Sequence, residues 1–197
     1  EKGREITGDQ ILLICGLMLK EQGRLKNDLL VSTVMSNLGL LVACRKYGFK
    51  HHASAVGDRY VLEDMQRLGS VLGGEDSGHL IFLDHATTGD GLISALQVVG
   101  ALVTSQRPLS DLAGASMQRV PQVLLNATLK TRRAIEQMPR TLGLIKETEG
   151  RLGQNGRVLV RWSGTEPKLR VMLEGENEAE IRVLAEGILE AARIDLA

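Results

Sequence analysis

Residues 29–47 read LLVSTVMSNLGLLVACRKY, and this stretch decides the fold class. Leu29 to Val34 form a short apolar run, which is typical of a buried strand. Leu38 to Tyr47 then carry apolar side chains at helical spacing, and Gly48 is a residue type that commonly ends a helix. A buried strand that leads directly into a helix is the repeating unit of α/β folds.

The same alternation continues on both sides of this stretch. Before it, Thr7 and Gln10 have the spacing of a capping box, and Gly23 ends the predicted helix. After it, the pattern predicts strands at residues 52–56, 71–72 and 80–83 and helices at residues 60–68 and 91–105. Elements of this length that alternate in this way predict an α/β sandwich domain with a largely parallel mixed sheet. In such sheets, ligands bind beyond the C-terminal ends of the strands.

The pattern changes after a short helix predicted at residues 109–115, and Pro121 begins a second part. Its predicted elements are a strand at 122–128, a helix around 130–137, a Gly-rich turn at 150–156, strands at 157–162 and 168–174, and a helix at 178–192 with Asn177 as its N-cap. Strands followed by a packed helix predict a small α+β domain, with an antiparallel sheet packed with helices. We therefore expect two domains, residues 1–117 and 118–197.

The composition excludes several classes of function. The 24 Lys and Arg residues balance the 24 Asp and Glu residues, and aromatic residues make up 3% of the chain. A neutral chain offers no general electrostatic attraction for nucleic acid, and few aromatics argue against a base-stacking surface, which leaves a local basic pocket as the alternative. No apolar run reaches the length of a membrane span. We therefore expect neither nucleic acid nor a membrane as a partner.

The cysteines and histidines show no metal or disulfide pattern. Cys15 and Cys44 lie in separate apolar runs, which favours a reducing compartment, and we expect the cytoplasm. His51, His52 and His85 have no Cys or carboxylate at ligand spacing, so we expect no metal site in this chain. Because the chain does not begin with Met, we expect it to be a fragment of a longer protein.

The sharpest local signal lies between the last two predicted strands. Arg161, Ser163, Gly164 and Thr165 combine a guanidinium group, two hydroxyls and a glycine whose backbone a ligand can approach closely. Arg170 adds a second positive charge from the next strand. This combination predicts a phosphate site. The alternative is an ordinary hairpin turn with two solvated arginines.

A second polar loop, Gly73 to His79, follows a predicted strand. Glu75 and Ser77 carry the oxygen atoms that recognise sugar hydroxyls by hydrogen bonds, and His79 can carry charge or move a proton. The alternative is a polar turn with a capping Asp.

Three further polar segments follow predicted strands. They are Ser36-Asn37, Asp58-Arg59 and Asp90. Each can act as a helix N-cap, and we favour that interpretation for Asp90 and for Ser36-Asn37.

Together these loops resemble the α-D-phosphohexomutase family over essentially the whole chain. Residues 74–79, GEDSGH, resemble the sugar-binding loop of the family's third domain, and residues 161–167, RWSGTEP, resemble the phosphate-binding loop of its fourth. Residues 35–37, 56–61 and 87–91 resemble the bacterial branch that acts on glucosamine phosphates. Relatives that act on mannose or glucose phosphates tend to carry other residues at the first two of these sites, including a histidine in place of Asp58.

The resemblance implies a four-domain enzyme that interconverts glucosamine 6-phosphate and glucosamine 1-phosphate. In that family, a phosphoserine of the first domain donates its phosphoryl group, and a bisphosphorylated sugar is the intermediate. Magnesium is held by the second domain, so the resemblance places neither the nucleophile nor the metal in this chain. We therefore expect the chain to need the N-terminal domains 1 and 2 of the same protein as partners and to be inactive alone.

The resemblance also assigns roles to individual residues. It assigns sugar binding to Glu75, Ser77, Asp58 and Arg59, and it places His79 near the reacting end of the sugar. It assigns the phosphate that is not transferred to Arg161, Ser163, Gly164, Thr165 and Arg170. Three alternatives stay open: a free-standing module that binds sugar phosphates, another phosphohexomutase that acts on mannose or glucose phosphates, and a purely structural or interaction domain.

Overall fold

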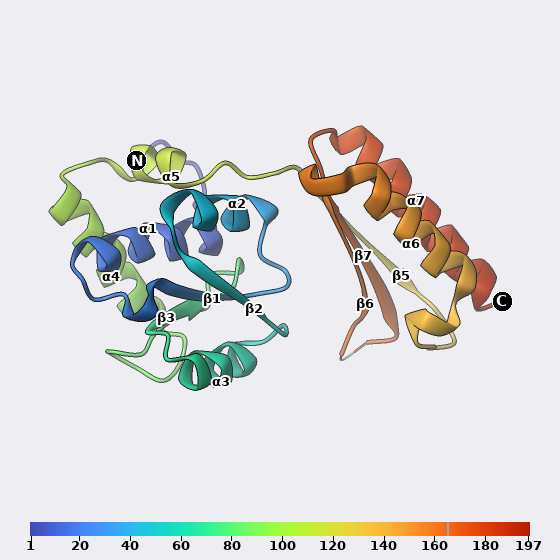
Figure 1. Cartoon of the computed structure of the whole chain (residues 1–197), viewed down its shortest axis with the longest axis horizontal. Helices are drawn as coiled ribbons and strands as arrows, with labels where there is room; N and C mark the ends of the chain where they lie inside the picture. The colour runs from blue at the N-terminus through green and yellow to red at the C-terminus, as the bar shows by residue number, and fades with distance from the viewer. Residues whose placement is uncertain (165) are drawn as a thin grey trace. The chain divides into compact units, whose positions relative to one another are not determined.

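The computed structural model describes residues 1–164 and 166–197 (Figure 1). The contacts between residues divide the chain into two compact units, Glu1–Arg119 and Val120–Ala197. Each unit has its own sheet and its own hydrophobic core.

A four-stranded sheet forms the centre of the first unit. Its strands, in the order β2-β1-β3-β4, are β1 (Leu29–Thr33), β2 (Lys50–Ser54), β3 (Leu72–Gly74) and β4 (Leu80–Phe82). β1 pairs in parallel with both β2 and β3, and β4 pairs antiparallel with β3. The prediction of a largely parallel mixed sheet is therefore confirmed. Because β1, β2 and β3 run in the same direction, their C-terminal ends meet at one edge of the sheet.

Helices cover both faces of this sheet. They are α1 (Gly8–Glu21), α2 (Leu38–Tyr47), α3 (Asp58–Leu68), α4 (Gly91–Ser105) and α5 (Leu109–Ser116), with a 3₁₀ turn, η1 (Lys26–Asp28), before β1. On one face, α1, α2, α4 and α5 surround a core that includes Leu12 and Leu30. On the other face, α3 places Val61 and Met65 against Val31 (Figure 1). β1 is buried at every position because both of its faces are covered.

The polar residues predicted as helix caps occupy those positions. Oδ1 of Asn37 accepts the N–H of Gly39 at 3.0 Å at the start of α2. Oδ1 of Asp90 accepts the N–H of Leu92 at 2.8 Å at the start of α4. At the start of α1, Oε1 of Gln10 accepts a backbone N–H at 3.1 Å. These bonds satisfy N–H groups that a helix N-terminus leaves without a partner, and the caps predicted at Asn37 and Asp90 are confirmed. Asp58 does not act as a cap, because the N-cap position of α3 is Gly57 and no side chain in the described part of the chain caps that helix.

The second unit is an antiparallel sheet with two helices on one face (Figure 1). Its strands, in the order β5-β7-β6, are β5 (Gln122–Thr128), β6 (Arg157–Trp162) and β7 (Lys168–Glu174), and its long helices are α6 (Pro139–Leu152) and α7 (Glu178–Asp195). Val123 and Val171 point from the sheet into the core beneath these helices. Asn177 caps α7, as predicted, and accepts the N–H of Ala179 at 3.0 Å.

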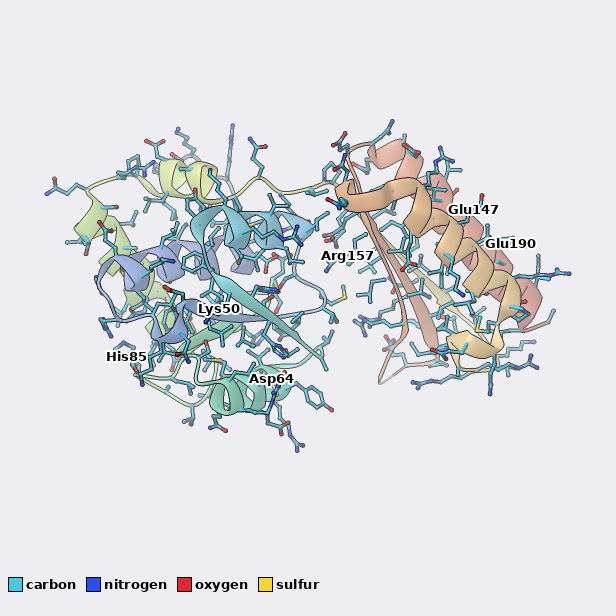
Figure 2. All side chains as sticks on the ribbon, viewed as in Figure 1. Lys50, Asp64, His85, Glu147, Arg157 and Glu190 are labelled. Carbon is cyan, nitrogen blue, oxygen red and sulfur yellow. The ribbon has the colours of Figure 1, made fainter. Side chains whose placement is uncertain are left out.

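The other face of this sheet carries charged side chains. Arg157, labelled in Figure 2, donates from Nε to Oε2 of Glu174 on the neighbouring strand at 2.9 Å. Glu174 is fully buried, so this ion pair replaces the water that the carboxylate would otherwise bind. The two sheet faces therefore differ in chemistry, because helices cover only one of them.

The helix predicted around residues 130–137 is wrong. That segment contains only a short 3₁₀ helix, η2 (Ile135–Gln137). A hydrogen bond from distant sequence fixes the residues before it, because Nε1 of Trp162 donates to the carbonyl oxygen of Arg133 at 2.7 Å. The local helical pattern is overridden by this contact with β6.

The helix that does form, α6, was not predicted, because its composition hides its apolar face. The helix buries Thr141 and Thr148, and it packs Leu144 and Ile145 against the core. Since two of the buried positions carry a hydroxyl, the apolar spacing in the sequence is sparse. The remaining signal is Pro139, which is favoured in the first turn of a helix. A second 3₁₀ turn, η3 (Gly153–Asn155), follows.

Cys15 and Cys44 are both buried and neither forms a disulfide. In the described part of the chain, no helix is both long and apolar enough to cross a membrane.

Candidate functional site

The C-terminal ends of β1, β2 and β3 bring the predicted loops of the first unit together. The N–H of Val34 donates to the carbonyl oxygen of Ser54 at 3.0 Å, which joins the loop after β1 to the end of β2. The N–H of Gly57 donates to Oε1 of Glu75 at 3.1 Å, which joins the loop after β2 to the loop after β3. Glu75 therefore lies beside the segment that carries Asp58.

The Glu75 loop, residues 75–79, is a closed turn. The N–H of Gly78 donates to the carbonyl oxygen of Glu75 at 2.9 Å, and the N–H of Glu75 donates to that of His79 at 3.0 Å. Gly78 has a φ of 97°, which residues with a side chain rarely adopt. The turn leaves Ser77 and His79 exposed, with Oγ of Ser77 3.3 Å from Nδ1 of His79. Both side chains are therefore accessible to a ligand.

The N-terminus of α1 lies against the Glu75 loop. The N–H of Gly8 donates to the carbonyl oxygen of Asp76 at 3.0 Å. A Cβ at Gly8 would overlap the carbonyl oxygen of Glu75 and would lie 2.7 Å from the nitrogen of Gly78. Only glycine allows the helix to approach the loop this closely.

The second carboxylate of the loop has a strong partner. Asp76 accepts two hydrogen bonds from Arg119, at 3.1 and 2.9 Å. This bidentate geometry is the most specific form of an ion pair between Arg and a carboxylate. The Glu75 carboxylate, in contrast, accepts the one hydrogen bond described above, from the N–H of Gly57. A carboxylate can accept about four hydrogen bonds, so Glu75 keeps capacity for a ligand.

Asp9, in the first turn of α1, is a buried acid that sequence reasoning missed. Its exposed fraction is 0%, and its Oδ2 accepts the N–H of Asn37 at 2.6 Å. Burial and then the negative charge of Asp76 raise the pKa of Asp9 to about 7. An acid in the first turn of a helix is usually a surface residue that interacts with the helix dipole. Only the packing of α1 against the loops shows that Asp9 is buried.

Asp58 and Arg59 lie at the start of α3, next to Gly57. Oδ1 of Asp58 accepts the N–H of Arg59 at 2.8 Å. Nε of Arg59 donates to Oε1 of Glu63 at 2.8 Å, and the Arg59 side chain is 81% exposed. Asp58 is thus close to the Glu75 loop through the backbone, whereas the Arg59 side chain pairs along the outer surface of α3.

In the second unit, two arginines face each other across the β6–β7 pair. Arg161 lies directly opposite Arg170 in the strand register. Nε of each is buried and has no hydrogen-bond partner among the described residues. Burial and then the charge of Arg170 lower the pKa of Arg161. A carboxylate oxygen of Glu166 lies 3.7 Å from a guanidinium nitrogen of Arg170 and compensates part of its charge. Like charges opposite each other destabilise a sheet, so the pair still favours an anion that contacts both arginines.

The turn between these strands supplies further polar groups. Ser163 is buried, and its Oγ lies 3.4 Å from a guanidinium nitrogen of Arg170. Gly164 is exposed, and a Cβ there would meet no atom within 4 Å. Glu166 pairs with Lys168 at 2.6 Å. The predicted residue Thr165 lies outside the described residues. Arg161, Ser163, Gly164 and Arg170 therefore form one cluster in the second unit.

The described residues hold no group of three or more His, Cys, Asp or Glu side chains that could bind a metal ion. The donor set that magnesium prefers is a cluster of carboxylate oxygens with water. The part of the chain that the structure describes therefore does not fit a magnesium site.

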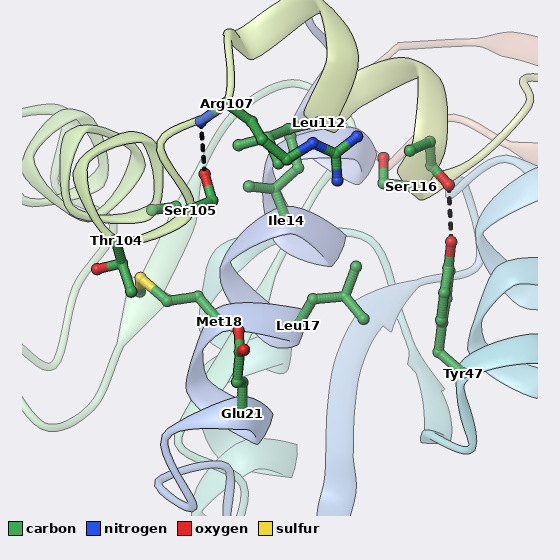
Figure 3. A pocket seen from close by; sticks show the side chains of 12 residues that line it. Ile14, Leu17, Met18, Glu21, Tyr47, Thr104, Ser105, Arg107, Leu112 and Ser116 are labelled. Atoms are coloured by element: carbon green, nitrogen blue, oxygen red, sulfur yellow. Dashed lines mark hydrogen bonds between the residues drawn. The ribbon is translucent and has the colours of Figure 1, made fainter.

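A cavity of about 240 Å³ lies between α1, α4 and α5 (Figure 3). Ile14, Leu17 and Leu112 form much of its apolar lining, and the hydroxyl of Tyr47 at its edge donates to the carbonyl oxygen of Ala115 at 2.7 Å. None of the residues predicted to bind a ligand lines it. The cavity is therefore separate from the Glu75 loop and the other predicted loops of the first unit.

Two family models match the chain in order. One is described as phosphoglucomutase/phosphomannomutase, alpha/beta/alpha domain III, and matches residues 7–120. The other is described as phosphoglucomutase/phosphomannomutase, C-terminal domain, and matches residues 124–191.

Curated relatives are similar to most of the chain. A phosphoglucosamine mutase of Syntrophobacter fumaroxidans is 63% identical over 178 residues, which are 90% of this chain and 39% of the relative. A phosphoglucosamine mutase of Sorangium cellulosum is 52% identical over 197 residues, which are 100% of this chain and 41% of the relative. The chain thus spans about two fifths of the length of the relatives it matches.

Solved structures share the fold at low sequence identity. An Aspergillus fumigatus N-acetylphosphoglucosamine mutase in complex with GlcNAc-6P and magnesium has a TM-score of 0.77 and 18% identity, over 97% of this chain and 44% of that chain. A phosphoglucomutase/phosphomannomutase family protein of Burkholderia thailandensis has a TM-score of 0.73 and 18% identity, over 98% of this chain and 43% of that chain.

Proposed function

The chain belongs to the phosphoglucomutase/phosphomannomutase family, and we propose that it is the sugar- and phosphate-binding part of a longer phosphoglucosamine mutase. That enzyme would interconvert glucosamine 6-phosphate and glucosamine 1-phosphate. The relatives at 63% and 52% identity are both phosphoglucosamine mutases, which favours glucosamine phosphates over mannose or glucose phosphates.

The observation that carries this proposal is the arginine pair of the second unit. Arg161 and Arg170 are opposite each other, each with a buried Nε that lacks a partner among the described residues. A phosphate group has the charge and the oxygen atoms to satisfy both guanidinium groups, and Arg recognises it in a bidentate manner. Ser163, Gly164 and Thr165 would complete the contacts to the phosphate that is not transferred.

In the first unit, the Glu75 loop would contact the sugar. Glu75 would accept hydrogen bonds from sugar hydroxyls, and Ser77 would donate or accept them, with Asp58 and Arg59 nearby. Exposed His79 would lie near the reacting end. His79 would hold or move a proton there.

The remaining chemistry would come from the preceding part of the full-length protein. We propose that this part supplies the phosphoserine and the residues that bind magnesium, which stabilises the charge of a transferring phosphoryl group when bound. We expect the full-length protein in the cytoplasm, since both cysteines are free, which suits a reducing compartment.

Turnover by the full-length protein tests the proposal. We expect a higher kcat/KM with glucosamine 6-phosphate than with glucose 6-phosphate or mannose 6-phosphate. Equal or higher values with glucose 6-phosphate or mannose 6-phosphate would refute the assignment to glucosamine and would favour another phosphohexomutase. In that case the protein would still be a mutase of this family, with another sugar phosphate as its substrate.

A further inference from the structure

Asp9 is a buried carboxyl that the proposed contacts to sugar and phosphate do not use. Its exposed fraction is 0%, and a buried carboxyl is costly unless it is hydrogen-bonded. It lies in the first turn of α1, immediately after Gly8, which contacts the Glu75 loop. The other buried positions of α1 are apolar or glycine, so a carboxyl at Asp9 requires an explanation in terms of its neighbours.

Two hydrogen bonds make the start of α1 a bridge between loops. Oδ2 of Asp9 accepts the N–H of Asn37, at 2.6 Å, from the loop after β1. The N–H of Gly8 donates to the carbonyl oxygen of Asp76, at 3.0 Å, in the loop after β3. Both loops leave the same edge of the sheet. Adjacent residues of one rigid helix therefore hold the two loops at a fixed spacing.

The titratable and charged groups that face Asp9 are Asp76, Arg119 and the thiol of Cys44. Burial and then Asp76 raise the pKa of Asp9 to about 7, whereas the Asn37 N–H and the Ser36 hydroxyl act in the opposite direction. Burial and then the charge of Asp9 raise the pKa of Cys44 to about 12. Arg119 binds the carboxylate of Asp76 with two hydrogen bonds. Ionisation of Asp9 therefore places a second negative charge beside a carboxylate that anchors the Glu75 loop.

We propose that Asp9 is a positioning residue that fixes the loop after β1 against α1 and thereby sets the position of the Glu75 loop for its ligand. The inference rests on the proposed function, because it takes Glu75 and Ser77 as the contacts to the sugar. Asp9 itself does not touch the ligand in this arrangement. Its carboxyl acts through the backbone of Asn37 and through the Asp76–Arg119 pair.

Two substitutions separate the hydrogen bond from the charge. Asp9→Asn keeps an acceptor for the Asn37 N–H and cannot ionise, whereas Asp9→Ala removes the acceptor. Asp111→Asn changes an exposed acid on α5 and serves as the matched control. Each variant would be made in the full-length enzyme. Hydrogen exchange of the peptide that contains residues 75–79 and the KM and kcat for glucosamine 6-phosphate would be measured across neutral pH.

We expect Asp9→Ala to speed exchange in the Glu75 loop and to raise KM by about tenfold, with kcat changed less than KM. Asp9→Asn should restore KM close to the wild-type value and should flatten its dependence on pH near 7. Asp111→Asn should change neither quantity. A lower melting temperature for Asp9→Ala, with loop exchange and KM unchanged, would show a merely structural residue and would overturn the inference.

Two further outcomes keep the inference distinct from the proposed function. Faster loop exchange with an unchanged KM would support the positioning role and would refute the sugar contact assigned to the loop. If Asp9→Ala does not fold, Asp9→Asn carries the test. A KM profile identical to that of the wild type across neutral pH would then overturn the inference.

Discussion

Individual residues of the Glu75 loop have different roles. The Ser77 hydroxyl is exposed and lies 3.3 Å from the His79 ring. The Glu75 carboxylate accepts the N–H of Gly57, at 3.1 Å, and so holds two loops together. A substitution at Ser77 therefore tests ligand contact, whereas a substitution at Glu75 tests contact and anchoring together.

Ser77→Ala should raise the KM of the full-length enzyme for glucosamine 6-phosphate and change the free energy of unfolding by less than about 0.5 kcal/mol. Glu75→Ala should also raise KM, and it should cost about 1 kcal/mol of stability because the Gly57 N–H loses its acceptor. Steady-state kinetics and chemical denaturation measure the two effects. If either variant unfolds at a much lower denaturant concentration than the wild type and keeps normal kinetics, the loop is structural.

The buried carboxyl of Asp9 predicts a dependence of stability on pH. Its pKa in the folded chain is raised to about 7, above its ordinary value of 3.8, so the folded state binds the proton more tightly. The stabilisation is fully present below about pH 4 and is lost as the pH rises to about 7, by at most about 1.4 kcal/mol per pH unit. We expect the wild type to lose stability relative to Asp9→Asn across this range. A difference in the free energy of unfolding between the two proteins that is the same at every pH would contradict this.

At the scale of secondary structure elements, the site depends on how closely α1 approaches the Glu75 loop. Gly8→Ala should destabilise the first unit by about 1–3 kcal/mol, because a Cβ would overlap the carbonyl oxygen of Glu75. Gly100→Ala is the matched control in the middle of α4, where a Cβ meets no atom within 4 Å. It should stabilise the helix by up to about 1 kcal/mol. Thermal unfolding distinguishes the two, and equal effects would refute the close approach.

The elements also show how far the sequence predicts this fold. The caps at Asn37, Asp90 and Asn177 are predicted correctly because their hydrogen bonds are local. α6 is missed because its buried face includes Thr141 and Thr148. In these helices, prediction succeeds where the deciding contact lies within a few residues along the chain.

In the candidate site, too, features that depend on local sequence are predicted and features that depend on distant contacts are not. The loops at the strand ends are predicted, because parallel strands place their C-terminal ends together. Burial of Asp9 and pairing of Asp76 with Arg119 depend on residues far apart in the sequence, so no local pattern reveals them. The opposition of Arg161 and Arg170 likewise requires the register of the β6–β7 pair.

At the scale of the whole molecule, the chain spans about two fifths of its curated relatives. We expect the purified 197-residue chain to show no mutase activity, because the proposed phosphoryl donor and the metal belong to the preceding part. A coupled assay that follows glucosamine 1-phosphate would test this, with the full-length enzyme as the positive control. Turnover by the chain alone would show that it contains a nucleophile of its own.

The most direct test of the central claim is a titration of this chain with inorganic phosphate, followed by backbone amide NMR. We predict shifts centred on Ser163 and Gly164, with an affinity that falls as the salt concentration rises. Arg161→Lys keeps the charge but loses the planar guanidinium, so binding should weaken by about fivefold, whereas exposed Arg151→Lys should bind as the wild type does. Shifts centred on the Glu75 loop, or equal binding by Arg161→Lys and the wild type, would contradict the assignment of the phosphate site.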